Sequence, residues 1–324
     1  MKVSILFIVL LLAAGGVRCM GQGSDSLLVL FWNMENFFDY RDTGKGESDH
    51  EFSSYGSRHW TKKRFQAKCN AFAKAVYRIS DIYGRMPDVI GLAEIENRNV
   101  LYSILRNTAL KKSDYSIIHY EGGDRRGIDV AMLYRSSIMS PESITRKVPV
   151  HHGDTLMTRD ILHVQMNLNG RYSLDFIVNH HPSKYGGEKA SEGRRMAAME
   201  CLKELCDSIA HLRTETVVAM GDFNDTPDSA PFEIIDSILV NKGRELHEKG
   251  QGSIRYEGKW ELIDMFMVSP EISRKTEMQI IKLPFLMVRD SKHSGEKPFR
   301  TYSGPRYIGG VSDHCPVVLH VYHL

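Results

Sequence analysis

The sequence is poor in cysteine and contains none of the spacings that would hold a structural metal. Only 5 cysteines occur among 324 residues, and they form no CxxC pair and no Cys/His pattern of a zinc site. A disulfide scaffold and a zinc module are therefore excluded. We expect buried thiols, or one incidental bridge, at Cys69, Cys201, Cys206 and Cys315.

The chain also lacks internal repeats, long Pro/Gly linkers and an excess of charge of either sign. It carries 42 Lys and Arg against 40 Asp and Glu, and two of the basic residues, Lys2 and Arg18, fall within the first 21 positions. The remaining chain is neutral overall and creates no general field that attracts polyanions. Binding of nucleic acid or phosphate must then depend on local basic patches or on a metal ion.

Long apolar runs are absent except near the N-terminus. The segment after Lys2 is apolar from Ile5 to Ala14 and continues into small residues, which is the layout of a secretory signal and too short for a permanent membrane span. We therefore expect residues 1–21 to be a signal peptide and the protein to be exported, periplasmic or extracellular, without stable membrane insertion. Lipid attachment at Cys19 is the less favoured alternative, because Arg18 stands where a small residue is normally required.

Residues 22–324 are expected to form one layered α/β domain. Runs of apolar and β-branched residues alternate with amphipathic segments, but not in strict βαβ order, which favours much antiparallel pairing. The predicted helices cover residues 61–83, 99–110 and 187–212. The predicted strands cover residues 27–32, 89–93, 115–120, 128–134, 161–168, 172–179, 216–220, 262–268 and 317–322.

Polar and ionisable residues collect where several of these strands end, which is where open α/β sheets place their sites. One such residue alone has an ordinary interpretation as a solvated carboxylate or a surface histidine. Asp264 is different, because it lies in the apolar run LIDMFMV and a buried carboxylate costs several kcal/mol without a partner. His314 is its natural partner, and together these residues predict a catalytic site.

The motifs WNMEN (32–36), DVIGLAEIE (88–96), NHHPSK (179–184), GDFND (221–225), LIDMF (262–266) and SDHCPV (312–317) resemble, in this order, those of the endonuclease/exonuclease/phosphatase superfamily. This superfamily includes pancreatic-type deoxyribonucleases, abasic-site endonucleases, inositol polyphosphate phosphatases and neutral sphingomyelinases. The resemblance implies a four-layer α/β/β/α sandwich of two packed mixed, largely antiparallel sheets, with residues 22–324 as the catalytic domain.

The resemblance also implies roles for individual residues. Carboxylate oxygens such as those of Glu35, Glu94 and Asp313 suit Mg²⁺, with Mn²⁺ as an alternative. The residues on family positions are Asn33, Glu94, Asp222, Asn224, Asp264, Asp313 and His314, while Glu35 matches a place where relatives often carry an acidic metal ligand and His180 matches a histidine of the deoxyribonuclease-like branch. Two adjacent histidines stand in NHHPSK, and strand alternation allows only one to face the site; we choose His180 over His181.

Hydrolysis of a phosphodiester requires neutralised charge, an oriented water and a protonated leaving oxygen. We expect Asp222 to be the general base and Asn33 and Asn224 to orient the water or the phosphate. His314, held by Asp264, is expected to stabilise the phosphoryl oxygen, and His180 to assist the leaving group. Arg126, Arg159, Arg195 and Tyr302 are the candidates for substrate binding, although solvated charge or simple turn structure explains them equally well.

These features together predict an exported, monomeric, metal-dependent phosphodiesterase that cleaves nucleic acid by direct attack of water. A phosphomonoesterase or a lipid headgroup phosphodiesterase on the same site is the alternative. A second alternative is an inactive binding protein of the same fold. No protein partner is predicted.

Overall fold

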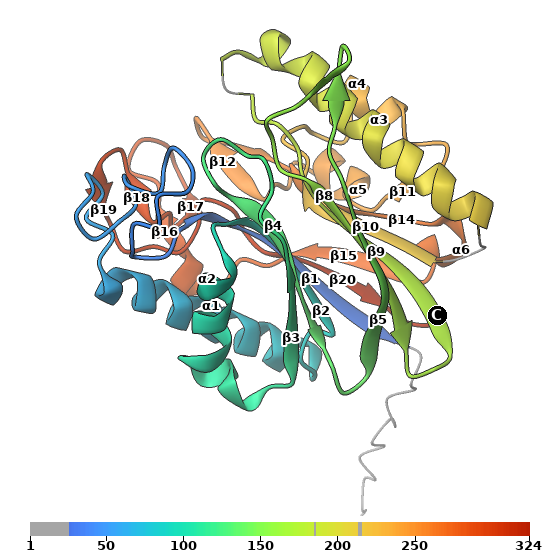
Figure 1. Ribbon diagram of the computed structural model, residues 1–324, viewed down its shortest axis with the longest axis horizontal. Coiled ribbons are helices and arrows are strands. Elements are labelled where there is room, and N and C mark those ends of the chain that lie inside the picture. The colour runs from blue at the N-terminus through green and yellow to red at the C-terminus, as the bar shows by residue number, and fades with distance from the viewer. Residues whose placement is uncertain (1–25, 185, 213–215) are drawn as a thin grey trace, which may run out of the picture.

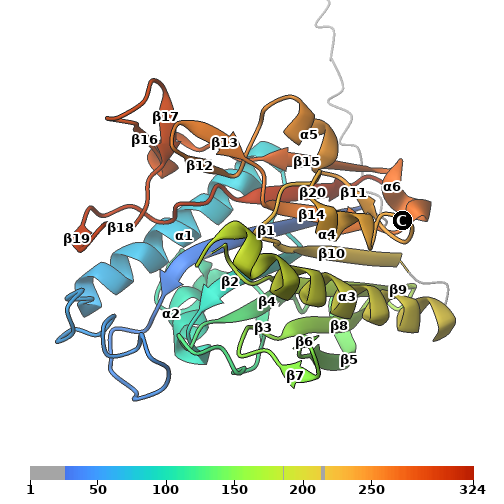
Figure 2. The same cartoon turned by 90° about the horizontal axis from the view of Figure 1, so that it is seen from above.

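The computed structural model describes residues 26–184, 186–212 and 216–324. The predicted signal peptide and Cys19 lie outside the described residues. In the described part of the chain two six-stranded sheets pack face to face, with helices α1 and α2 outside one sheet and α3 outside the other (Figure 1 and Figure 2). The predicted α/β/β/α arrangement is therefore confirmed.

The first sheet has the strand order β15-β20-β1-β2-β4-β3, and the second has the order β11-β14-β10-β9-β8-β5. The strands of the first sheet, in this order, are Thr276–Ile280, Val317–Val321, Leu27–Phe37, Val89–Ile95, Asp129–Arg135 and Tyr115–His119. Those of the second are Val240–Asn241, Asp264–Val268, Thr216–Asp222, Tyr172–His180, Ile161–Leu168 and Met139–Lys147.

Three longer helices and several short elements complete the described chain. The helices are α1 (Lys62–Tyr83), α2 (Arg98–Arg106), α3 (Glu188–Leu212), α4 (Ala230–Glu233), α5 (Arg244–Glu248) and α6 (Pro270–Ser273), with 3₁₀ turns at Ala109–Lys112 and Pro284–Leu286. Four small hairpins are β6 (Val150–His151) with β7 (Asp154–Thr155), β12 (Ile254–Tyr256) with β13 (Lys259–Glu261), β16 (Met287–Arg289) with β17 (Glu296–Pro298), and β18 (Tyr302–Ser303) with β19 (Arg306–Tyr307).

Strand β1 separates the two hydrophobic cores. Leu28 and Leu30 belong to the core beneath α1, while Val29 and Phe31 belong to the core between the sheets, because successive side chains of a strand point to opposite faces. All four are fully buried, and each such side chain contributes roughly 1.5–3 kcal/mol of hydrophobic stabilisation. A strand that is apolar on both faces is therefore the central strand of a covered sheet.

Three edge strands, β5, β11 and β15, were not predicted, and one predicted strand begins late. Strand β5 carries mainly exposed or half-exposed polar side chains, which suit a sheet edge but give no apolar signal in the sequence. Strand β14 begins at Asp264 rather than at Leu262, so this aspartate starts the strand instead of lying in its middle. It is nevertheless fully buried, and the argument that it needs a partner is unchanged.

The cysteines of the described residues are free thiols; Cys69, Cys206 and Cys315 are buried and Cys201 is partly buried. This agrees with the expectation of thiols and not with that of a disulfide bridge. Within the same residues no helix has the length and apolarity needed to cross a membrane.

The topology brings distant strand ends to one edge of the sandwich. Strands β1 and β2 run parallel, as do β9 and β10, so each pair ends at the same edge. In the second sheet Asp222, the last residue of β10, lies opposite both His180 of β9 and Asp264 of β14. Asp222 is thereby placed beside two residues that are each 42 positions away from it in the sequence.

Candidate active site

The Asp222 carboxylate lies at the centre of the site. Asn33 donates from Nδ2 to Asp222 Oδ2 at 2.9 Å, and the backbone N–H of Asn224 donates to Oδ1 at 2.9 Å. Burial, together with the nearby Asp264 carboxylate, raises the pKa of Asp222 to about 7. A carboxylate held in this way has the basicity that a general base needs near neutral pH.

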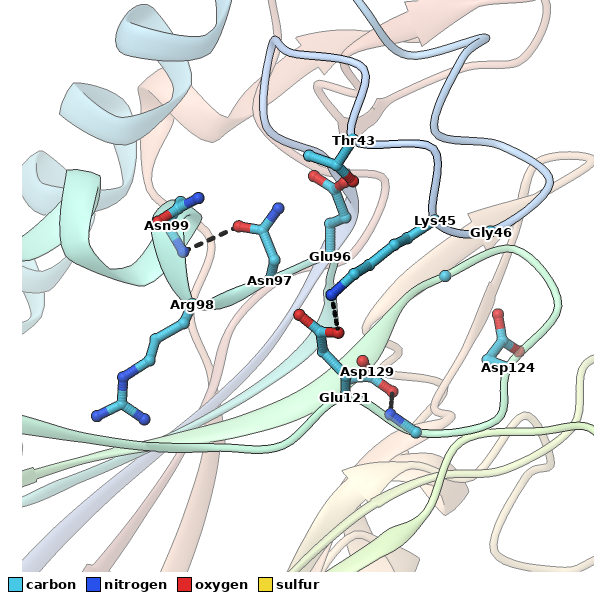
Figure 3. A pocket seen from close by; sticks show the side chains of 12 residues that line it. Thr43, Lys45, Gly46, Glu96, Asn97, Arg98, Asn99, Glu121, Asp124 and Asp129 are labelled. Atoms are coloured by element: carbon cyan, nitrogen blue, oxygen red, sulfur yellow. Dashed lines mark hydrogen bonds and ion pairs between the residues drawn. The ribbon is translucent and has the colours of Figure 1, made fainter.

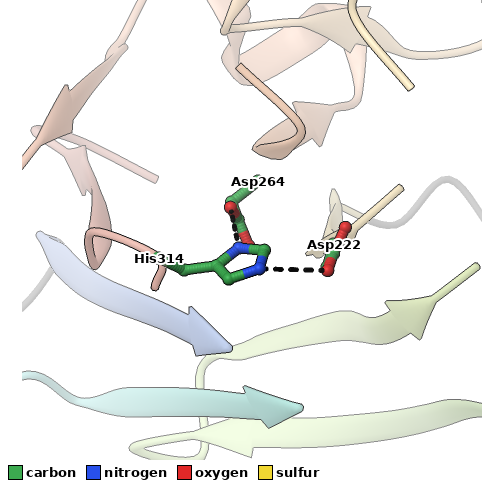
Figure 4. Close-up of side chains that lie close together, drawn as sticks. All are labelled: Asp222, Asp264 and His314. Carbon is green, nitrogen blue, oxygen red and sulfur yellow. Dashed lines mark hydrogen bonds and ion pairs between the residues drawn. The ribbon is translucent and has the colours of Figure 1, made fainter. Parts of the chain in front are cut away.

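Asp264 and His314 form a hydrogen-bonded pair beside Asp222 (Figure 4). Asp264 Oδ2 lies 2.7 Å from His314 Nδ1, and His314 Nε2 lies 3.9 Å from Asp222 Oδ2. Burial alone would lower the pKa of the imidazole, but the Asp264 and Asp222 carboxylates raise it well above its usual value. His314 is thus a fixed imidazolium with Nε2 directed toward Asp222.

His180 approaches Asp222 as a second imidazole. Its Nε2 atom is 3.7 Å from Asp222 Oδ2 and 3.9 Å from Glu94 Oε1. Burial, with the Arg159 and Arg126 guanidinium groups, lowers the pKa of His180 well below its usual value, so this ring is neutral. Asp222 therefore has one cationic and one neutral imidazole as neighbours.

His181 points away from this centre and packs edge-on against Phe223, with ring centroids 5.0 Å apart. Neither of its ring nitrogens has a hydrogen-bond partner in the described structure, and the ring is buried. Burial, with Arg159 and Arg195 nearby, lowers the pKa of His181 to about 3. The alternation of strand β9 thus directs His180, and not its neighbour, toward Asp222.

We expect the His181→Phe variant to be less sensitive to acid. The pKa of His181 is lower in the folded protein than the roughly 6.5 of an unfolded chain, so protonation favours unfolding and stability falls as pH drops from about 6.5 toward 3. At pH 5 this single group costs about 2 kcal/mol. The free energy of unfolding, measured in urea at pH 5 and at pH 7, should differ less between the two pH values for His181→Phe than for the wild type. The control His152→Phe, at an exposed position, should behave as the wild type does. An equal difference in all three would contradict this account.

Glu35, Glu94 and Asp313 form an acidic group on the other side of the centre, and Arg300 links two of them. Arg300 Nη2 lies 2.9 Å from Asp313 Oδ2, and Arg300 Nε lies 3.4 Å from Glu35 Oε1. Burial and the Asp313 carboxylate raise the pKa of Glu35 to about 7. The Lys68 ammonium donates to the Glu35 carbonyl at 2.6 Å. Two cations thus offset part of the negative charge of this group.

These three carboxylates fit a divalent cation. Glu94 Oε2 accepts from the Asn36 N–H at 2.5 Å, which fixes this carboxylate, and Oε1 faces His180 and Arg126 at 3.9 and 3.8 Å. Asp313 is partly exposed and is open to a ligand from solvent. Carboxylate oxygens are the donors that Mg²⁺ and Mn²⁺ prefer, although in the described structure these three side chains do not bring their oxygens within 4.8 Å of one another.

A second group with the spacing of metal ligands is Asp222, Asp264 and His314, whose ligand atoms lie within 4.8 Å of one another. Two of these atoms are already bonded to each other, since His314 Nδ1 meets Asp264 Oδ2 at 2.7 Å. An imidazolium is a hydrogen-bond donor and has no free lone pair for a metal. This arrangement suits proton and charge transfer, and it is also the group of described residues whose ligand atoms lie this close together.

Several site residues adopt left-handed backbone conformations, which only glycine adopts without strain. The φ angles are 46° for Glu35, 48° for Asn36, 61° for Glu94 and 54° for Asn224. Such conformations cost of order 1–3 kcal/mol each and cluster at functional sites. They show that the chain is bent where strands β1, β2 and β10 end, and that the bends aim side chains into one centre.

The four predicted substrate-binding residues differ in position. Arg126 is partly exposed and its Nη2 lies 3.8 Å from Glu94 Oε1, so it lies at the rim of the centre. Arg159 is buried, donates to the His181 carbonyl at 2.8 Å and pairs with Asp124 at 3.2 Å. It supports strand β9 from behind and does not reach the open side of the site.

Arg195 and Tyr302 require correction. Arg195 is 1% exposed and is held by Asp225 Oδ2 at 2.5 Å and Ser191 Oγ at 2.6 Å, so the prediction that it binds substrate is wrong. The Tyr302 ring is buried in an aromatic cluster and its hydroxyl donates to the Arg58 carbonyl. Because the Arg58 guanidinium lies over this ring, no base is able to stack on that face.

Two functional residues were not among the predicted site residues. Arg300 lies in a loop, and its contact with Glu35 spans 265 positions. Lys68 carries a signal in the sequence, because it falls on the buried stripe of α1 between Phe65 and Phe72. A lysine on an apolar stripe needs a buried polar partner, which here is the Glu35 carbonyl.

The fold and this centre together define the class of a phosphate-ester hydrolase, and comparison with known proteins gives the family. The sequence profile described as the endonuclease/exonuclease/phosphatase family matches residues 28–323. The chain belongs to this family of phosphoesterases. No curated protein has a sequence similar enough to match.

Solved structures with this fold have low sequence identity. A family member from Bacteroides thetaiotaomicron is 16% identical with a TM-score of 0.59, over 92% of this chain and 98% of that one. The human Nocturnin catalytic domain with bound sulfate is 13% identical with a TM-score of 0.57, over 91% and 93%. The mannosyl-6-phosphatase of Bacteroides thetaiotaomicron is 13% identical with a TM-score of 0.56, over 90% and 98%. At these identities the likeness shows the shared fold.

Proposed function

We propose that the protein is a metal-dependent phosphodiesterase that hydrolyses nucleic acid, and that it is exported through residues 1–21 and acts as a monomer. The observation that supports the catalytic part is the position of Asp222 between a neutral and a cationic imidazole. Its Oδ2 atom lies 3.7 Å from His180 Nε2 and 3.9 Å from His314 Nε2. A base, a charged donor and a neutral imidazole are the groups that attack by water on a phosphate ester requires.

The residues of the centre divide the work of the reaction. A divalent cation held by Glu35, Glu94 and Asp313 would supply positive charge to the phosphate when bound. Asp222 accepts a proton from the attacking water, and Asn33 fixes its carboxylate through the 2.9 Å hydrogen bond. His314 directs its charged Nε2–H toward the phosphoryl oxygens, with Asp264 holding the ring. His180 donates a hydrogen bond to the departing oxygen, which takes up its proton from solvent.

Cations on two sides of the centre favour a chain of phosphates as substrate. Arg126 lies beside Glu94, and Arg300 lies beside Asp313 and Glu35. Both side chains are partly exposed, at 39% and 47%. A phosphomonoester presents one phosphate to the metal and needs no further cation, whereas a nucleic acid presents neighbouring phosphates to both arginines.

A sugar phosphate is the second candidate, and one pocket favours it. This carboxyl-rich pocket, of about 330 Å³, is lined in part by Asp124 (Figure 3), whose carboxylate lies 3.9 Å from Arg126 at the rim of the centre. Burial raises the pKa of Glu96 to about 8 and that of Asp129 to about 7, so that near neutral pH Glu96 is mostly protonated and Asp129 is partly protonated. Its lining of Glu96, Asn97, Glu121, Asp124 and Asp129 offers many partners for hydroxyl groups.

A substrate panel tests the proposal. Supercoiled plasmid, a single-stranded oligonucleotide, bis(p-nitrophenyl) phosphate and mannose 6-phosphate are each incubated with the purified protein and Mg²⁺ or Mn²⁺. We expect cleavage of both DNA substrates, lost on addition of EDTA and lost in Asp222→Ala. Activity confined to the sugar phosphate, or to phosphoinositides or sphingomyelin, would overturn the nuclease assignment. Absence of turnover on every substrate with either metal would identify a binding protein of this fold.

A further inference from the structure

A second pocket adjoins the centre, and its chemistry is opposite to that of the carboxyl-rich pocket because arginines line it. This arginine pocket, of about 290 Å³, is lined by Glu35, Asn36, Phe52, Arg58, Arg300 and Tyr302. It shares Glu35 and Arg300 with the acidic group of the centre, so a substrate bound there continues directly from the reacting phosphate. Arg300 is the cation already placed beside the centre, and Arg58 is the guanidinium group that the proposed mechanism leaves without a role.

Arg58 is a built component of this pocket. Its guanidinium lies 5.4 Å from the ring centroids of both Phe52 and Tyr302. Nε donates to Glu51 at 2.6 Å and Nη1 donates to the Gly304 carbonyl at 2.6 Å. The side chain is still 26% exposed. Arg58 is therefore held in one orientation before any ligand arrives, which lowers the entropic cost of binding.

Arg300 is held more loosely and its partners are the acidic residues of the centre. It pairs with Asp313 at 2.9 Å and with Glu35 at 3.4 Å, and 47% of its side chain is exposed. A divalent cation on these carboxylates would take over the charge balance that Arg300 now provides. The guanidinium is then available to an anion in the pocket that it already lines.

We propose that the arginine pocket binds a second phosphate of the substrate, next to the one that reacts, through Arg300 and Arg58. This rests on the proposed nuclease function and gives the bound chain a direction. Guanidinium groups suit phosphate because their planar array of N–H donors matches two phosphate oxygens at once. The ligand is a phosphate in a chain of phosphodiesters.

The carboxyl-rich pocket lacks a comparable anion site among its described residues. Its Lys45 is paired with Glu121 at 2.6 Å (Figure 3), and its Arg98 donates to the Tyr102 hydroxyl at 2.9 Å. Four carboxyl groups line this pocket, those of Glu96, Glu121, Asp124 and Asp129, whereas the arginine pocket is lined by one, that of Glu35. The phosphate-bearing chain therefore leaves the centre across Arg300 and Arg58, and the carboxyl-rich pocket takes an uncharged part of the substrate.

The test is the salt dependence of oligonucleotide binding. Fluorescein-labelled octathymidylate is titrated with Asp222→Asn protein at saturating Mg²⁺, and anisotropy gives Kd at several KCl concentrations. Each phosphate contact on a single strand contributes about 0.7 to the slope of log K against log salt. We expect Arg300→Gln and Arg58→Lys to weaken binding, and Arg300→Gln to reduce the slope by about 0.7. Arg58→Lys keeps the charge but loses the fork, so its slope should change less.

Arg98→Gln in the same background is the matched control and should leave the slope unchanged. An unchanged Kd and slope in Arg300→Gln and Arg58→Lys would overturn the proposal, as would a reduced slope in Arg98→Gln alone. Circular dichroism of each variant excludes a folding defect, and Arg300→Gln alters a half-exposed side chain that α/β packing does not need. Cleavage of plasmid by the wild type with unchanged slopes would reject this subsite alone, whereas failure of the wild type to cleave DNA would reject both proposals.

Discussion

Asp222→Asn is expected to lower kcat by about 10²–10⁴-fold, the range for loss of a general base. Asparagine has the same shape but cannot accept a proton from water. It also replaces one carboxylate oxygen by an NH₂ group, which is only a donor. The side chain of the variant therefore keeps one acceptor oxygen and loses the hydrogen bond from either Asn33 or the Asn224 N–H. The loss should fall on kcat rather than on KM, because the basicity of this group matters chiefly when water attacks.

The matched control for this variant is Asp228→Asn. Asp228 follows Asp222 by six positions, and its side chain is 69% exposed. Rates for bis(p-nitrophenyl) phosphate and for an oligonucleotide should be unchanged in the control, and thermal unfolding of both variants should show intact folds. A kcat for Asp222→Asn within about threefold of the wild type, on either substrate, would remove the general base from this account.

Glu94→Gln should lower the affinity for Mn²⁺ by at least about 100-fold. Loss of a group that merely supports a metal ligand typically costs 10–100-fold, so loss of a ligand should cost no less. The amide keeps the length and shape of the side chain but has no charge to offer a divalent cation. Isothermal titration of Mn²⁺ into the substrate-free protein measures this directly and does not depend on turnover.

Glu121→Gln provides the comparison, since Glu121 is a half-exposed carboxylate of the carboxyl-rich pocket paired with Lys45. Its Mn²⁺ affinity should equal that of the wild type. Asp264→Asn should also leave Mn²⁺ affinity within a few-fold, because we assign Asp264 to His314. Loss of Mn²⁺ binding in Asp264→Asn with full binding in Glu94→Gln would exchange the two assignments.

Those parts of the site that depend on local sequence could be predicted without the structure. Asp264 had to have a buried partner, and the structure places His314 Nδ1 at 2.7 Å from it. Strand alternation indicated that only one of His180 and His181 faces the centre, and His180 does so. The layered fold was implied by the motif series, and apolar periodicity located most of the central strands.

Ion pairs between residues far apart in the sequence could not be predicted in the same way. The pairing of Arg300 with Asp313 and Glu35 depends on how a loop closes over the sheet edge, and no periodicity encodes this. Arg195 illustrates the opposite error. An arginine near a catalytic motif resembles a phosphate ligand in sequence, but α3 turns it inward to neutralise Asp225. The charge of a single residue does not reveal whether the helix turns that side chain toward the centre or into the core.

The central claim is that Glu35, Glu94 and Asp313 hold the metal, beside an Asp–His pair that does not. Anomalous diffraction from crystals soaked in Mn²⁺, recorded near the manganese absorption edge, locates the ion without reference to activity. We predict one strong peak in contact with Glu94 and Asp313 and a displaced Arg300 side chain. A peak between Asp222, Asp264 and His314 instead, or no peak at saturating Mn²⁺, would contradict the account.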